Sequence, residues 1–137
     1  AKPAHNRTWS VPAPDGHDEV PTTGATYVSA LEDGKVRSFE ILPEDAGLPL
    51  AKPEDLKGGA PEENAKALRA LLEGQPGAYR DVVLFNTAAA LMVSEKVSTL
   101  KDGVALAAET IDSGKALAKL EALIKVTNSL NEAVAHD

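Results

Sequence analysis

The sequence has 137 residues, of which 43% are hydrophobic and 26% charged, the composition of a globular chain of about one domain. A formal net charge of −7 disfavours nucleic-acid binding, because phosphate backbones are contacted by clustered Lys and Arg. The absence of cysteine excludes disulfides and thiolate metal sites, and no apolar run approaches the ~20 residues of a membrane span. We therefore expect a cytoplasmic protein with no nucleic-acid or membrane partner.

The first part of the chain is rich in proline and carries short strand-like segments. Three strands are predicted, at residues 7–11, 26–31 and 35–42. The last two flank Glu32-Asp33-Gly34, whose Asp-Gly pair predicts an antiparallel hairpin. Alternation in the second of these strands places Phe39 and Ile41 on one face. Trp9 is expected to pack on the sheet rather than stack on a ligand.

A long connection follows the hairpin, from Pro43 to Gly59. It contains three prolines and three glycines and shows no clear helical or strand pattern, which is long for a compact domain. We expect it to cover part of the molecule or to pack on a neighbour. Gly58-Gly59 is expected to be a turn that leads into the first helix.

The second half of the chain reads as four helices. The first begins at Pro61 and ends at Gly74, the second covers about 79–96, and Ser98 or Thr99 caps the third. Asp112-Ser113-Gly114 separates the third from the last, which repeats an apolar residue at helical spacing, namely Leu117, Leu120 and then Leu123 or Ile124.

The second helix has an unusual centre, "VVLFNTAAALMV" at 82–93, which is apolar nearly all round. A helix of this kind is buried on several sides. Asn86 is one of its polar exceptions, and we expect it to be a buried residue that bonds to neighbouring backbone.

These elements predict an α/β fold, or α+β when the chain is taken alone, with a small sheet containing a hairpin and about four C-terminal helices packed on it. A parallel sheet whose other strands lie outside this chain would give the same pattern. In that case the sheet edge near Arg7 lacks a neighbour and would recruit another chain, either more of the same protein or a second copy.

The stretch "VPAPDGHDEVPTTG" at 11–24 contains the strongest candidate site. Asp18 and Glu19 are adjacent carboxylates in a turn, and Mg²⁺ is typically held by one or two carboxylates plus waters and substrate phosphates. Thr22-Thr23-Gly24 offers hydroxyl and backbone donors to an anion. His17 is either a third ligand or an exposed loop histidine. Taken alone, the pattern also fits a solvated turn.

Four segments carry a family resemblance. They are "DGHDEVPTTGATYVSALEDGKVRSFEILPEDAGL" (15–48), "DLKGGAPEENAKALRALLEG" (55–74), "DVVLFNTAAALMV" (81–93) and "TIDSGKALAKLEAL" (110–123). In order and spacing they resemble the anthranilate phosphoribosyltransferases. The resemblance implies part of a nucleoside phosphorylase-like fold, with residues 1–137 as a single or partial domain that corresponds to the C-terminal portion of such an enzyme.

The resemblance also implies a function. The family transfers phosphoribosyl from phosphoribosyl pyrophosphate to anthranilate in tryptophan biosynthesis, and its adjacent Asp and Glu, here Asp18 and Glu19, hold Mg²⁺ on the pyrophosphate. The family's phosphate-binding loops and anthranilate contacts lie upstream, so no catalytic or substrate-binding residue is assigned to this chain. We expect the isolated chain to be inactive and to associate with the remaining portion or with a second copy.

Two alternatives remain at this point. The chain reads Val11-Pro12-Ala13 where the family has Val-His-Gly, which favours a non-catalytic structural or interaction module derived from the family. A related nucleoside phosphorylase-like enzyme is disfavoured by the Asp-Glu and Thr-Thr-Gly stretch.

Overall fold

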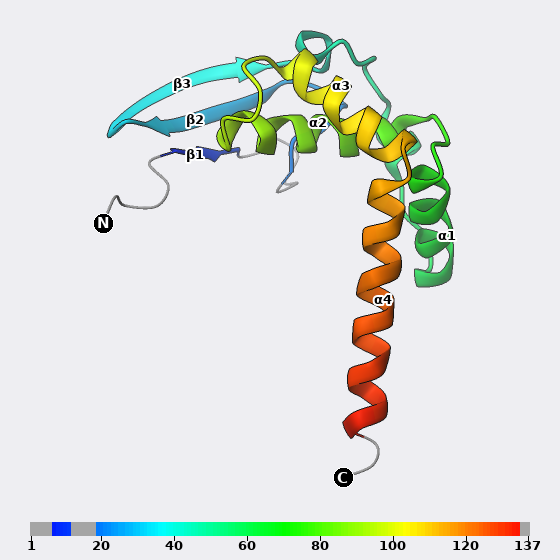
Figure 1. Ribbon diagram of the computed structural model, residues 1–137. Helices are drawn as coiled ribbons and strands as arrows, with labels where there is room; N and C mark the ends of the chain where they lie inside the picture. The colour runs from blue at the N-terminus through cyan, green and yellow to red at the C-terminus, as the bar shows by residue number, and fades with distance from the viewer. Residues whose placement is uncertain (1–6, 12–18, 135–137) are drawn as a thin grey trace, which may run out of the picture.

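The computed structural model describes residues 7–11 and 19–134 (Figure 1). The chain forms a small sheet followed by helices, which confirms the predicted mixed fold. The elements in order are β1 (Arg7–Ser10), β2 (Thr26–Glu32), β3 (Lys35–Ile41), the 3-10 helices η1 (Pro43–Ala46) and η2 (Pro53–Leu56), α1 (Pro61–Leu72), α2 (Ala78–Val93), α3 (Leu100–Asp112) and α4 (Lys115–Val134).

The three strands form one antiparallel sheet in the order β1-β2-β3. The predicted hairpin is confirmed, with register from Thr26 opposite Ile41 to Glu32 opposite Lys35. Asp33 and Gly34 in its turn both have positive φ, at 51° and 77°, as the favoured two-residue hairpin turn requires. Among the described strands, β1 pairs only with β2 and so lies at an edge of the sheet.

One face of the sheet is covered by helices. Along β2, Thr26, Val28 and Ala30 are buried, whereas the residues between them are exposed. Trp9 lies opposite Ala30 and contacts Phe39 edge-to-face, with ring centroids 5.3 Å apart. Trp9 therefore packs on the sheet, as expected.

An ion pair lies close to the turn of the hairpin. Arg37 Nε donates to Glu32 Oε2 at 3.0 Å, and the same guanidinium lies 4.4 Å from the centre of the Phe39 ring. The hydrogen bond from Arg37 holds the pKa of the Glu32 carboxyl below its usual range. Because these groups are solvated, the pair contributes little to stability.

The connection 43–59 is more regular than the sequence indicated. It contains two short 3-10 helices, each begun by a Pro-Glu-Asp sequence. The carboxylate of Asp45 accepts from the N–H of Leu42 at 2.8 Å, and that of Asp55 accepts from the N–H of Lys52 at 3.1 Å. Each pattern is too short to give a helical period, which is why the sequence prediction of an irregular segment was wrong here.

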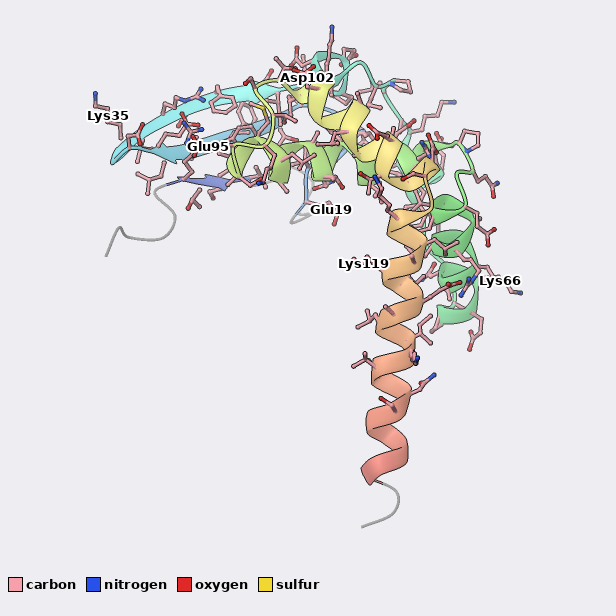
Figure 2. All side chains as sticks on the ribbon, viewed as in Figure 1. Glu19, Lys35, Lys66, Glu95, Asp102 and Lys119 are labelled. Carbon is pink, nitrogen blue, oxygen red and sulfur yellow. The ribbon has the colours of Figure 1, made fainter. Side chains whose placement is uncertain are left out.

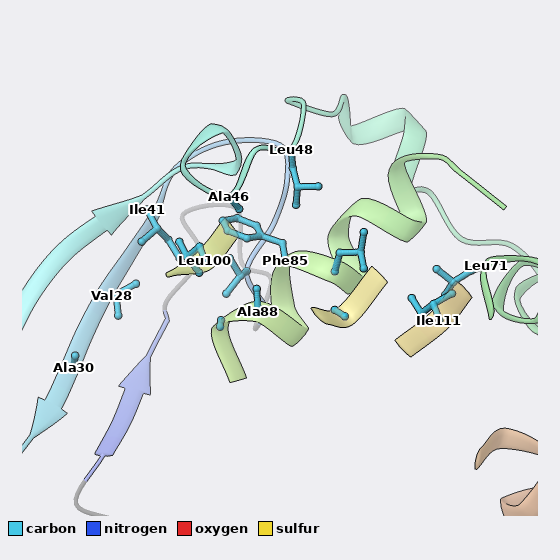
Figure 3. Packing of buried hydrophobic residues seen from close by; sticks show 14 residues of the cluster. Val28, Ala30, Ile41, Ala46, Leu48, Leu71, Phe85, Ala88, Leu100 and Ile111 are labelled. Atoms are coloured by element: carbon cyan, nitrogen blue, oxygen red, sulfur yellow. The ribbon is translucent and has the colours of Figure 1, made fainter. Parts of the chain in front are cut away.

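Helix α2 packs closely against α3 and supplies part of the buried core (Figure 3). Phe85 and Ala88 of α2 are completely buried, which confirms the prediction from its apolar centre. Helix α3 comes close to α2 at Gly103, where a Cβ would lie 2.7 Å from the Cβ of Ala88 and 2.8 Å from its Cα. The absence of a side chain at Gly103 therefore sets the separation of the two helices.

The last two helices follow the predicted boundaries. Thr99 caps α3, with its hydroxyl accepting from the N–H of Asp102 at 3.1 Å, and the break at Gly114 has φ of 75°. Helix α4 extends away from the sheet, alongside α1 (Figure 1). Its predicted apolar stripe is only partly covered by the described residues, since Leu123 is 60% exposed. In the described ranges no helix is both long and apolar enough to cross a membrane.

Substitution of Gly103 by Ala is expected to destabilise the chain. Overpacking costs about 1–3 kcal/mol, which the better helix propensity of alanine offsets by about 1 kcal/mol. Thermal unfolding of the 137-residue chain measures the effect, with Gly24→Ala as the matched control, because a Cβ at Gly24 meets no heavy atom within 4 Å. Equal stability of the two variants would show that the contact between α2 and α3 is not tight.

Candidate functional site

A cavity of about 470 Å³ lies among the described residues. Three parts of the chain form its walls: the segment before β2, the residues in and after η2, and α2. The lining residues are Glu19, Pro21, Thr23, Pro53, Glu54, Leu56, Lys57, Gly58 and Val82. The cavity combines carboxylates, a hydroxyl and an ammonium group, a set that suits a cation together with an anion.

Glu19 is the described member of the predicted metal pair. Its side chain is exposed and lines the cavity, at the start of the segment that leads into β2 and beside α2 (Figure 2). Asp18 and His17 lie outside the described residues. Within the described ranges, no three His, Cys, Asp or Glu side chains come together as a metal cluster.

The two threonines after Glu19 have different environments. Thr23 lines the cavity, as an anion donor should. Thr22 is fully buried, and its hydroxyl finds no hydrogen-bond partner among the described residues. Of the two threonine hydroxyls, that of Thr23 lies on the cavity, whereas that of Thr22 is turned into the interior.

The part of the cavity lining that follows η2 was not predicted from the sequence. Lys57 follows η2 and places a basic residue on the cavity that Glu19 also lines. The neighbouring residue Gly59 is held by Asn64 of α1, whose Oδ1 accepts from the N–H of Gly59 at 2.9 Å and whose Nδ2 donates to the carbonyl of Gly59 at 3.0 Å. A Cβ at Gly59 would clash with the side chain of Glu63. Gly58 and Gly59 lead into α1, as expected, but without the predicted turn at these two residues.

Helix α2 contributes Val82 to the cavity lining. Asn86 lies one turn later on the same helix. Asn86 is half-buried and bonds to the backbone of Val20 and Val82, which confirms the expectation that it bonds to neighbouring backbone. Burial raises the pKa of the Asp81 carboxyl, which precedes Val82, and the positive charge of Arg80 opposes that change.

Sequence comparison identifies the family. Residues 3–117 match the family described as "Glycosyl transferase family, a/b domain". The chain belongs to this family. Anthranilate phosphoribosyltransferase of Parvibaculum lavamentivorans is 58% identical over 123 residues, and that of Rhodopseudomonas palustris (strain BisB18) is 56% identical over 121 residues. These matches cover 90% and 88% of this chain, which spans 36% of the length of each relative.

Solved structures agree with this assignment. The crystal structure of anthranilate phosphoribosyltransferase from Thermus thermophilus has 39% identity and a TM-score of 0.74, covering 84% of this chain and 34% of that one. The Saccharomyces cerevisiae enzyme in complex with PRPP and Mg has 30% identity and a TM-score of 0.82, covering 90% of this chain and 36% of that one. The resemblance seen in the quoted motifs is confirmed.

Replacement of Asn64 by Ala is expected to loosen the backbone at Gly59, close to Lys57. Loss of two solvated hydrogen bonds to Gly59 should cost roughly 1–2 kcal/mol of unfolding free energy and speed the exchange of the Gly59 amide. Thermal unfolding and hydrogen exchange measure both effects, with Lys66→Ala as a control at an exposed position of the same helix. Unchanged exchange at Gly59 would contradict this role of Asn64.

Proposed function

We propose that this chain is part of an anthranilate phosphoribosyltransferase and that Asp18 and Glu19 hold Mg²⁺ on the pyrophosphate of its substrate. The observation that carries the proposal is the exposed Glu19 carboxylate on a cavity of about 470 Å³, which Thr23 and Lys57 also line. The identity of 58% to an enzyme of that name supports it, as does the likeness to the yeast enzyme in complex with PRPP and Mg.

The donor set at this cavity fits magnesium. Carboxylate oxygens are its usual protein ligands, and it commonly keeps waters and substrate phosphates in the remaining positions. A solvent-accessible position for Glu19 suits an ion that arrives together with its substrate.

The proposed reaction breaks the bond from C1 of the ribose to the pyrophosphate oxygen and forms a bond from C1 to the anthranilate nitrogen, which then loses a proton. Asp18 and Glu19 would hold the magnesium, which would supply positive charge where the departing pyrophosphate becomes more negative. Lys57 provides an ammonium group, and Thr23 a hydroxyl, for phosphate oxygens at the same cavity.

The proposal extends to the rest of the protein. Residues 1–137 would correspond to the C-terminal portion of the enzyme's α/β domain, and the remaining portion would supply the other phosphate and anthranilate contacts. The edge strand β1 is a natural place for that portion or a second copy to join the sheet. We expect the 137-residue chain alone to show no turnover, and a complete enzyme to act in the cytoplasm.

The test uses a complete enzyme that carries this chain. The 123-residue matched segment of the Parvibaculum lavamentivorans relative is replaced by the corresponding segment of this chain, and loss of anthranilate fluorescence is followed with phosphoribosyl pyrophosphate and Mg²⁺. We expect magnesium-dependent turnover. Substitution of both Asp18 and Glu19 by Ala should lower kcat/KM by roughly 100-fold or more, as removal of groups that stabilise developing charge does.

Glu40→Ala is the matched control, because Glu40 is an exposed carboxylate on β3 outside the cavity lining. Activity that survives loss of both Asp18 and Glu19 would show that the metal assignment is wrong. A hybrid that folds and binds its partners but has no turnover would favour the alternative of a non-catalytic module derived from this family.

A further inference from the structure

The side chain of Asn86 binds the backbone of the residue that directly follows Glu19. Its Oδ1 accepts from the N–H of Val20 at 2.9 Å, and its Nδ2 donates to the carbonyl of the same residue at 2.8 Å. A third hydrogen bond, from Nδ2 to the carbonyl of Val82 at 2.9 Å, anchors the amide to its own helix. Asn86 and Val20 are 66 residues apart in the sequence, so the contact joins α2 to the candidate site.

The orientation of this amide is determined by its partners. The N–H of Val20 can only donate, whereas the carbonyls of Val20 and Val82 can only accept. The oxygen of Asn86 must therefore face the N–H, and both hydrogens of its NH₂ group are used by the two carbonyls. The amide is neutral and fully paired on the side that faces the segment, so it holds the backbone without adding charge beside the carboxylates.

The two bonds to Val20 act on the peptide units on both sides of that residue. Its N–H belongs to the planar unit that also contains the carbonyl of Glu19, and its own carbonyl belongs to the unit shared with Pro21. Hydrogen bonds to both units restrict their rotation about the Cα of Val20 and, through the first unit, restrict the backbone of Glu19. The position from which the Glu19 carboxylate projects therefore depends on Asn86.

Neighbouring residues add to this restraint. The side chain of Val20 is 2% exposed and packs into the core, and Pro21 disfavours helical dihedrals at Val20. Further along, the carbonyl of Thr22 accepts from the N–H of Ala51 at 2.8 Å. The segment is thus held after Glu19 by contacts with α2 and with the connection between η1 and η2, while Glu19 itself stays exposed.

We propose that Asn86 is a positioning residue for the carboxylate of Glu19 in the proposed metal site. This inference rests on the proposed function, since it assigns Asn86 a role in the same metal site. Asn86 touches neither substrate nor metal in this role and acts through the backbone of Val20. A purely structural role would lower the stability of the fold without a selective effect on metal affinity.

The experiment compares Asn86→Ala with Thr87→Val in the hybrid enzyme described above. Thr87 is a matched control, because it is also half-buried on α2 and its hydroxyl donates only to the carbonyl of Val83 in its own helix, at 2.7 Å. Two quantities are measured: hydrogen exchange of the Val20 amide in enzyme labelled with ¹⁵N-valine, and binding of Mn²⁺, as a probe for Mg²⁺, with phosphoribosyl pyrophosphate present.

We expect Asn86→Ala to speed the exchange of the Val20 amide at least tenfold and to weaken Mn²⁺ binding by roughly 10- to 100-fold, the usual effect of removing an outer partner of a metal site. Thr87→Val should change neither. Mn²⁺ affinity within twofold of the Thr87→Val value, or unchanged exchange at Val20, would overturn the proposal.

Asn86→Asp decides the question if Asn86→Ala does not fold. It keeps the shape of the side chain and one acceptor for the N–H of Val20, but an ionised carboxylate cannot donate to the two carbonyls. Added negative charge alone would strengthen cation binding, so weaker Mn²⁺ binding in this variant supports a positioning role, and equal or stronger binding contradicts it. The variant that combines Asp18→Ala with Glu19→Ala and keeps Asn86 tests the metal assignment. If this variant still binds Mn²⁺ as the parent does, the metal assignment itself is wrong.

Discussion

The close contact of α2 with α3 is the constraint on which the rest of the structure depends. Phe85 and Ala88 of α2 are fully buried there, and Gly103 of α3 has no room for a side chain against Ala88. With few aromatic residues in the chain, close approach of small residues supplies packing that larger side chains supply elsewhere. These contacts set the direction of α2. They therefore also set the positions of Val82 and Asn86 on the same helix.

The same helix forms part of the candidate site. Val82 lines the cavity, and Asn86, one turn later on the same side, bonds to Val20 behind Glu19. Asn64 of α1 holds Gly59 in a similar way. Its side-chain amide accepts from the N–H of Gly59 and donates to the carbonyl of the same residue. Loops that carry exposed charged groups are thereby held by neutral side chains on helices, which leaves the charged groups available to a ligand.

Local signals in the sequence were sufficient for much of the fold. The Asp-Gly turn, Thr99 with Asp102, and the glycine after Ser113 act within a few residues, and each appears in the structure where expected. The two 3-10 helices were missed because four residues are too few for a period. The sequence offered Thr22-Thr23-Gly24 as anion donors and gave no sign of Lys57, because the side on which a loop residue lies depends on the path of the whole segment.

By itself, the sequence determined the strands, the α-helices, the hairpin and the family, since these depend on dihedral preferences, alternation and motifs that can be read within short stretches. Tertiary structure alone decided that residues around Glu19, Lys57 and Val82 share one cavity and that Asn86 pairs with Val20. It also decided that the apolar stripe of α4 is left partly uncovered by the described residues, as Leu123 shows. The physical reason is that burial and hydrogen-bond partners far apart in the sequence are set by packing, which no local pattern encodes.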